Sequence, residues 1–70
     1  MLYKRFNNSS QIFSASYIEI DNTLKIKFHK GYTYEYYNVP EEAFIELCNA
    51  DSVGSYFNKN IARKFKFKKV

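Results

Sequence analysis

The segment that most constrains the fold runs from Gly31 to Pro40 and has the sequence GYTYEYYNVP. Tyrosines stand at positions 32, 34 and 36, and this period of two places them on one face of an extended strand. Gly31 supplies the backbone freedom that a tight turn needs. Pro40 cannot donate a ladder hydrogen bond and suits the first position of a helix. The segment therefore predicts a strand that leads directly into a helix.

The residues before this segment predict two further strands. Residues 24–29 alternate apolar side chains with lysines and a histidine, the pattern of a half-buried strand. The apolar residues of 11–20 keep no single alternation, which indicates a bend or bulge around residues 14–16. Residues 21–23 form a turn signal. Three strands joined by short turns predict an antiparallel meander.

After Pro40 the apolar spacing becomes that of two short helices. Phe44, Leu47 and Cys48 stand at i, i+3 and i+4, with glutamates mostly on the outward side. Asp51 or Ser52 can cap a second helix. Gly54 in its first turn is unfavourable by about 1 kcal/mol relative to alanine, which indicates close packing there. The predicted apolar face of this helix consists of Val53, Tyr56, Phe57 and Ile61.

These elements predict an α+β domain of the order β-β-β-α-α. It has a three-stranded antiparallel meander, two short helices packed on one face of it, and a basic C-terminal tail. The tail, residues 65–70, forms a short added strand or an extended arm. Residues 1–8 form a lead-in or a short edge strand, and residues 9–70 form the single domain. If Leu24, Ile26 and Phe28 face the helices, Lys25, Lys27 and His29 lie on the uncovered face.

Composition and charge narrow the class of protein. A chain of 70 residues makes one domain. One cysteine excludes the internal disulfide framework of small secreted domains. No signal peptide or membrane span is evident, so we expect a cytoplasmic protein without a membrane partner. The net charge is +4, and residues 52–70 carry six Lys and Arg and no acid. Such a basic end favours an anionic partner. Alternatively, it neutralises the five acids of residues 31–51 and keeps the protein soluble.

The order of the motifs resembles the KTSC domain family, named after the C-terminus of certain lysyl-tRNA synthetases. Tyr34-x-Tyr36 followed by Val39-Pro40 is similar to its central signature. Ser9-Ser10-x-Ile12 is similar to its opening, and residues 50–63 with Phe65-x-Phe67 are similar to its second half. The resemblance covers residues 9–70. It implies a small domain that occurs alone in bacterial and phage proteins or attached to a synthetase, with RNA binding as the usual suggestion.

The chain offers little for catalysis. Cys48 and His29 are its only thiol and imidazole, and Cys48 stands on an apolar helix face, as a buried structural thiol does. His29 has no companions for a metal site. No Gly-rich phosphate loop is present. We therefore expect no enzyme activity, no metal and no cofactor.

A nucleic-acid partner agrees better with the residue types. Single strands of RNA or DNA are bound by rings that stack on bases and cations that contact phosphates. We expect Tyr34 and Tyr36 to belong to the core rather than to a binding surface. Such binding, through the basic C-terminal helix and tail, is expected to be electrostatic and weakly sequence-specific. The predicted contact residues are Tyr37, Lys59, Arg63, Lys64, Lys66 and Lys68.

The alternative is a protein-interaction module. An open sheet edge can pair with a strand of a second copy or of a host protein. A small phage or mobile-element protein that blocks host defence machinery belongs to this class. Nucleic-acid binding weakens steeply with salt, whereas protein binding depends on apolar edge residues.

Overall fold

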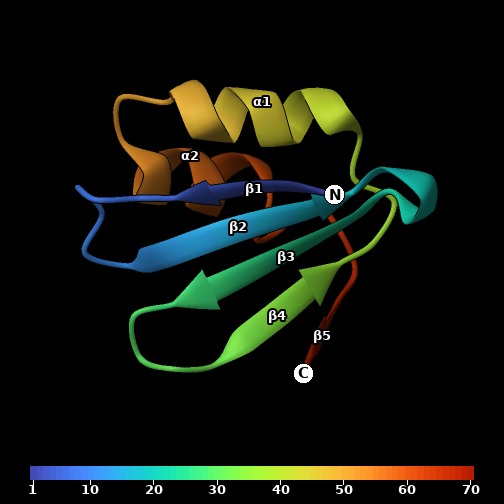
Figure 1. The fold of residues 1–70 in the computed structure, drawn as a ribbon, viewed down its shortest axis with the longest axis horizontal. Helices are drawn as coiled ribbons and strands as arrows, with labels where there is room; N and C mark the ends of the chain where they lie inside the picture. Colours follow the sequence, from blue (N-terminus) through green and yellow to red (C-terminus); the bar gives the residue numbers. More distant parts are fainter.

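A computed structural model describes all 70 residues as a five-stranded antiparallel sheet with two helices on one side (Figure 1). The strands follow one another across the sheet in chain order: β1 (Leu2–Arg5), β2 (Ile12–Ile18), β3 (Thr23–Phe28), β4 (Thr33–Tyr36) and β5 (Phe67–Lys69). A turn of 3-10 helix, η1 (Glu19–Asp21), joins β2 to β3. The helices α1 (Glu41–Asn49) and α2 (Val53–Asn60) separate β4 from β5.

The predicted α+β class is confirmed, but the prediction of three strands is wrong. Residues 2–5 form an edge strand on β2, and residues 67–69 form an added strand on β4. Both extra strands satisfy backbone groups that a three-stranded meander would leave unpaired at its edges. Their sequences give little signal because β1 is largely exposed and β5 is wholly exposed. Neither strand needs the alternation of apolar and polar residues that identifies β3.

The register of β4 decides which face the tyrosines occupy. Leu24 lies opposite Tyr36 and Ile26 lies opposite Tyr34, so both tyrosines are on the face that the helices cover. Tyr36 is buried, as expected of a core ring, whereas Tyr34 is half-buried against the edge of the core. Gly31 has a φ of +103°, which confirms the predicted tight turn before β4.

The core fills the space between the helices and the covered face of the sheet. Leu24, Ile26 and Leu47 are wholly enclosed. The Tyr17 ring stacks on Phe44 with ring centroids 5.7 Å apart. Its hydroxyl donates to the Val39 carbonyl oxygen at 2.6 Å, which ties β2 to the connection between β4 and α1. Burial is the main cause of the raised pKa of Tyr17, so this hydroxyl keeps its proton.

The helices begin and pack much as their sequences predict. The Ser52 hydroxyl accepts a hydrogen bond from the Ser55 amide at 3.3 Å, which identifies Ser52 as the N-cap of α2. A Cβ added at Gly54 would lie 2.9 Å from Gln11 Oε1, which confirms the predicted close approach. The buried residues are Phe44 and Leu47 on α1, and Val53, Phe57 and Ile61 on and after α2.

Candidate functional site

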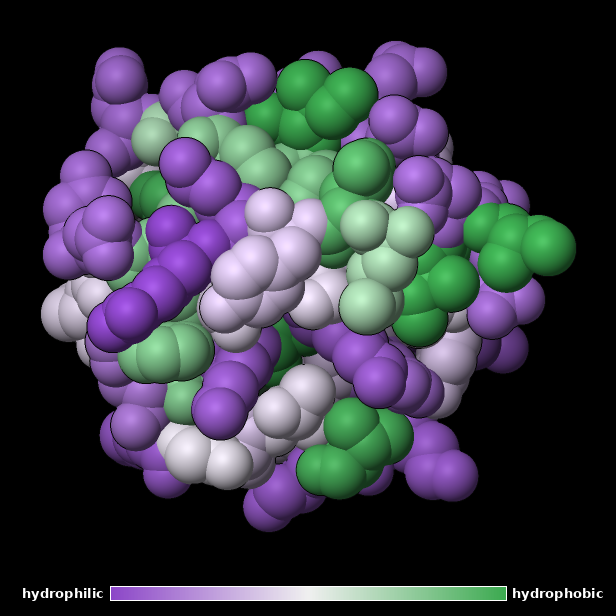
Figure 2. All heavy atoms as spheres, in the orientation of Figure 1, coloured by the Kyte–Doolittle hydropathy of each residue, from purple (hydrophilic) through white to green (hydrophobic).

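The side of the sheet away from the helices, called the open face below, is polar and mainly basic. The register aligns two rows of residues across it: Tyr3, Ser16, Lys25, Glu35 and Lys68, and beside them Arg5, Ser14, Lys27 and Thr33. Figure 2 is drawn in the orientation of Figure 1, with this side forward, and shows purple hydrophilic side chains around paler and green ones. Glu35 is the only acidic residue in the five strands. The open face therefore carries a net positive charge.

A β-bulge places the Phe13 ring on the open face. The register of β2 against β3 shifts between Ile12 and Ser14, so Phe13 is the extra residue. The bulge thus lies next to the predicted position. The Arg5 guanidinium carbon is 4.8 Å from the centroid of the Phe13 ring, and the Lys27 ammonium nitrogen is 5.4 Å from it. Both distances are within the range of cation–π contacts. Two cations and one ring thus form a compact group.

A second group surrounds Glu35 near the other edge of the open face. The Tyr37 hydroxyl donates to Glu35 Oε1 at 3.1 Å, and Lys25 Nζ lies 3.5 Å from Glu35 Oε2. Burial, followed by the bond to Glu35, raises the pKa of Tyr37, so the hydroxyl remains a donor at neutral pH. The Tyr37 amide donates to the Lys66 carbonyl oxygen at 2.9 Å, which places Lys66 opposite Tyr37. Lys68 lies opposite Glu35.

The six residues predicted to bind nucleic acid do not form one site. Tyr37, Lys66 and Lys68 come together at the open face because β5 returns along β4. Lys59 and Arg63 instead line an open hollow along α2, on the helix side of the sheet. Lys64 lines a separate hollow with Glu42 and Glu46 of α1. The basic end of the chain therefore divides between both sides of the sheet, and binding through the basic C-terminal helix and tail stays a prediction.

Arg5 and Phe13 are not among the contact residues predicted from the sequence. Residues 1–8 show no clear period, and the pairing of β1 with β2 is what places Arg5 beside Ser14 and Phe13. The irregular alternation of residues 11–20 was the available signal for Phe13, because a bulge redirects a side chain to the other face. Leu24, Ile26 and Phe28 are buried, which confirms the placement of Lys25 and Lys27 on the uncovered face.

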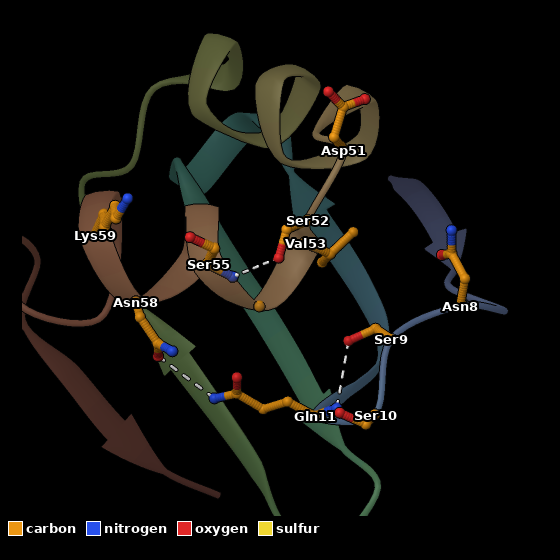
Figure 3. A pocket seen from close by; sticks show the side chains of 11 residues that line it. Asn8, Ser9, Ser10, Gln11, Asp51, Ser52, Val53, Ser55, Asn58 and Lys59 are labelled. Atoms are coloured by element: carbon orange, nitrogen blue, oxygen red, sulfur yellow. Dashed lines mark hydrogen bonds between the residues drawn. The ribbon is translucent and has the colours of Figure 1, made fainter.

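A polar groove lies at the end of the sheet beside α2 (Figure 3). It encloses about 560 Å³ between the loop that precedes β2 and the first two turns of α2. Gln11 Nε2 donates to Asn58 Oδ1 at 3.4 Å across it, and the Ser9 hydroxyl accepts the amides of Gln11 and Ile12. The bond between Gln11 and Asn58 joins the two walls, so we read the groove as a seam between the loop and α2.

The structure brings no catalytic set together. Cys48 is half-buried and lines a hollow with Lys4 and Phe6, and burial raises the pKa of its thiol. His29 instead packs edge-on against Phe13 and bonds to the Ser9 carbonyl oxygen. No three His, Cys, Asp or Glu side chains are grouped so as to hold a metal ion. Neither helix has the length and apolar character that a membrane crossing requires.

Comparison with known proteins identifies relatives of the whole domain. A KTSC domain protein from Yersinia pestis has a crystal structure with a TM-score of 0.86 and 35% identity, covering 99% of both chains. A protein from Tsukamurella paurometabola is 38% identical over 58 residues, which are 83% of this chain and 87% of that protein. A lysine–tRNA ligase from Nostoc punctiforme is 44% identical over 61 residues, which are 87% of this chain and 11% of the ligase.

The family assignment follows from these matches. The chain spans about a tenth of the length of the ligases that it matches, so the similarity concerns one small module of those enzymes. The model of the KTSC domain matches residues 8–65. This range includes β2, β3, β4 and both helices. The chain therefore belongs to the KTSC domain family.

Proposed function

We propose that this protein is a non-catalytic module that binds RNA or single-stranded nucleic acid on the open face. The proposal rests on the arrangement of cations around two aromatic rings of the open face. Arg5 and Lys27 lie against Phe13, and Lys66 and Lys68 lie beside Tyr37. Cations contact phosphates, and rings stack on bases, in proteins that bind single strands.

The charge distribution supports an anionic ligand of low sequence specificity. Glu35 is the single acid among the strand residues, and Lys25 and Tyr37 already bind its carboxylate. The remaining cations of the open face have no acidic partner within 4 Å. Phosphate contacts of this kind release counterions, so binding is expected to weaken steeply as the salt concentration rises.

The similarity to part of a lysine–tRNA ligase supports RNA as the form of nucleic acid. The name of that enzyme identifies tRNA as its substrate, and this chain corresponds to about a tenth of the enzyme's length. A basic module attached to such an enzyme is well suited to hold the substrate by its phosphates. We therefore take tRNA and single-stranded RNA as the first ligands to test.

A protein partner is the second candidate, and the two edge strands favour it. The outer edges of β1 and β5 have no neighbouring strand, and either could pair with a host protein or a second copy. Phe67 and Val70 are exposed next to the β5 edge. Such binding would persist at moderate salt, which separates it from phosphate binding.

The proposal is tested by fluorescence anisotropy of labelled tRNA and of a single-stranded RNA at low and near-physiological salt. One triple variant, Lys27→Gln, Lys66→Gln and Lys68→Gln, removes three cations of the open face. Its matched control is the triple variant Lys59→Gln, Arg63→Gln and Lys64→Gln, which removes three cations elsewhere and has the same net charge. The open-face variant is expected to lose at least about tenfold in affinity and to show a shallower salt dependence.

The control variant distinguishes the effect of where the cations lie from the effect of the total charge of the protein. It is expected to bind more tightly than the open-face variant, although its net charge is the same. Equal losses in the two variants would show that net charge alone governs binding and would overturn the assignment to the open face. No binding by the unmodified protein at low salt would overturn the nucleic-acid proposal altogether.

A further inference from the structure

Three aromatic rings form a shelf on the helix side of the sheet, at its β5 edge. The shelf consists of Tyr32, Tyr34 and Phe67. The rings of Tyr34 and Phe67 are stacked, with centroids 5.1 Å apart and an angle of 21° between their planes. The centroids of Tyr32 and Tyr34 are 5.4 Å apart. The shelf is thus a continuous aromatic surface built from β4, β5 and the turn before β4.

Phe67, at the outer end of the shelf, is exposed because the helices do not extend over β5 (Figure 1), whereas Tyr32 and Tyr34 are half-buried. Phe67 lies opposite Tyr36 in the register, so both rings are on the helix side. Tyr36 is only 2% exposed, whereas Phe67 is 53% exposed. Within a single row of the sheet, the aromatic residues therefore pass from the core to the solvent. An exposed phenylalanine that continues the core in this way is available to a ligand.

Cations accompany the rings on both sides of the β5 edge. Lys69 Nζ lies 5.3 Å from the centroid of the Tyr32 ring, on the shelf. Lys68, the preceding residue, lies opposite Glu35 and points to the open face. The three-residue strand β5 thus presents one lysine to each side of the sheet, and no further strand covers its outer edge.

We infer that a single strand of nucleic acid crosses the β5 edge, with a base stacked on the exposed Phe67 ring of the shelf. This inference rests on the proposed function and extends it from the open face to a second side of the sheet. Phosphates on either side of the stacked base would meet Lys68 and Lys69.

The chemistry of the shelf favours this occupant over a second copy of the chain. A second copy packed shelf against shelf would remove two Lys69 side chains from water, and the shelf itself contains no acid to pair with them. A phosphate supplies that negative charge in the ligand. A base offers a flat π surface, which a phenylalanine ring accepts regardless of sequence.

The test uses tryptophan as a reporter, because the chain contains none. Phe67→Trp retains an aromatic face on the shelf, and its fluorescence is quenched when a base stacks on it. Ile45→Trp on α1 is the matched control, since Ile45 is exposed and lies away from β5. Each reporter is titrated with a single-stranded RNA and with an abasic oligomer of the same length. A further variant, Phe67→Leu, keeps apolar volume but removes the ring, and its affinity is measured by anisotropy.

Quenching of Phe67→Trp by RNA but not by the abasic oligomer, without quenching of Ile45→Trp, is the expected result. Phe67→Leu is expected to bind RNA about tenfold more weakly. If RNA binds the unmodified protein but neither result is seen, the shelf inference is overturned while the proposed function stands. If no RNA binds even at low salt, the proposed function is overturned and the inference with it. Quenching that instead follows protein concentration without RNA would assign the shelf to a second copy.

Discussion

The two faces of the sheet are built from alternate residues of the same strands, yet they have opposite chemistry. In β3, Leu24 and Ile26 are fully buried beneath the helices, whereas Lys25 and Lys27 lie on the open face. The covered face holds the apolar contacts that stabilise a domain of this size, and the open face carries almost none. Residues on the open face can therefore change with little effect on folding, which leaves that face available for binding.

The largest expected difference between the faces comes from neighbouring residues of β3. Ile26→Ala removes a side chain that is 0% exposed and leaves a cavity, so we expect a loss of about 2–5 kcal/mol in the free energy of unfolding. Lys27→Ala on the other face is expected to change it by about 0.5 kcal/mol or less. Urea unfolding followed by circular dichroism measures both. A similar loss in the two variants would contradict the assignment of stability to one face.

A pH titration tests the burial of Tyr36 on the covered face. Burial raises the pKa of Tyr36 to about 12, above its ordinary value of 10. The folded state therefore binds more protons than the unfolded state between these values, so stability falls as the pH rises from about 10 to about 12. The full shift corresponds to about 2–3 kcal/mol. Tyr36→Phe cannot ionise at this position, and its unfolding free energy is expected to fall less over the same range. Parallel pH profiles of the two proteins would show that Tyr36 does not govern the loss.

Whether a residue could be assigned to the covered or the open face from the sequence depends on the strength of the local sequence pattern. Residues 24–29 alternate so strictly that the sequence predicts both faces of β3. Residues 41–49 have helical spacing, and α1 forms there. By contrast, Arg5 and Lys68 are on edge strands whose exposure removes the need for any pattern. Their positions depend on pairing with distant residues, which no local spacing encodes.

The candidate site was harder to predict than the fold for the same reason. The cations of residues 59–68 are close in sequence, and the predicted binding used this basic helix and tail. The chain leaves α2 and returns along β4, so Arg63 and Lys68 end on different sides of the sheet. Phe13 reaches the open face only through a bulge. Composition thus favours an anionic ligand, whereas long-range pairing determines where the cations lie.

A tyrosine-to-phenylalanine substitution, made once on each face, is expected to give a smaller difference in the free energy of unfolding. Tyr17→Phe removes a hydroxyl that donates to the Val39 carbonyl oxygen at 2.6 Å in the core, and the buried acceptor is left unsatisfied. We expect a loss of about 1–2 kcal/mol. Tyr37→Phe removes a donor to Glu35, a partner that retains Lys25 and access to water. Its expected loss is about 0.5 kcal/mol or less. Thermal unfolding compares the two, and a greater loss from Tyr37→Phe would contradict the division between the faces.

Glu35→Gln is expected to change the free energy of unfolding least, and its effect on RNA affinity tests the role of the open face. The variant loses the ion pair with Lys25, whose atoms are 3.5 Å apart and partly exposed. Such pairs contribute about 0.5 kcal/mol, and the amide oxygen still accepts a bond from Tyr37. It also removes the only acid in the five strands and frees Lys25 for a phosphate. If the open face binds nucleic acid, affinity for single-stranded RNA at low salt should rise about threefold. A fall in affinity would instead show that Glu35 contributes by holding Tyr37 and Lys25 in position, because the loss of negative charge alone can only strengthen the binding of an anion.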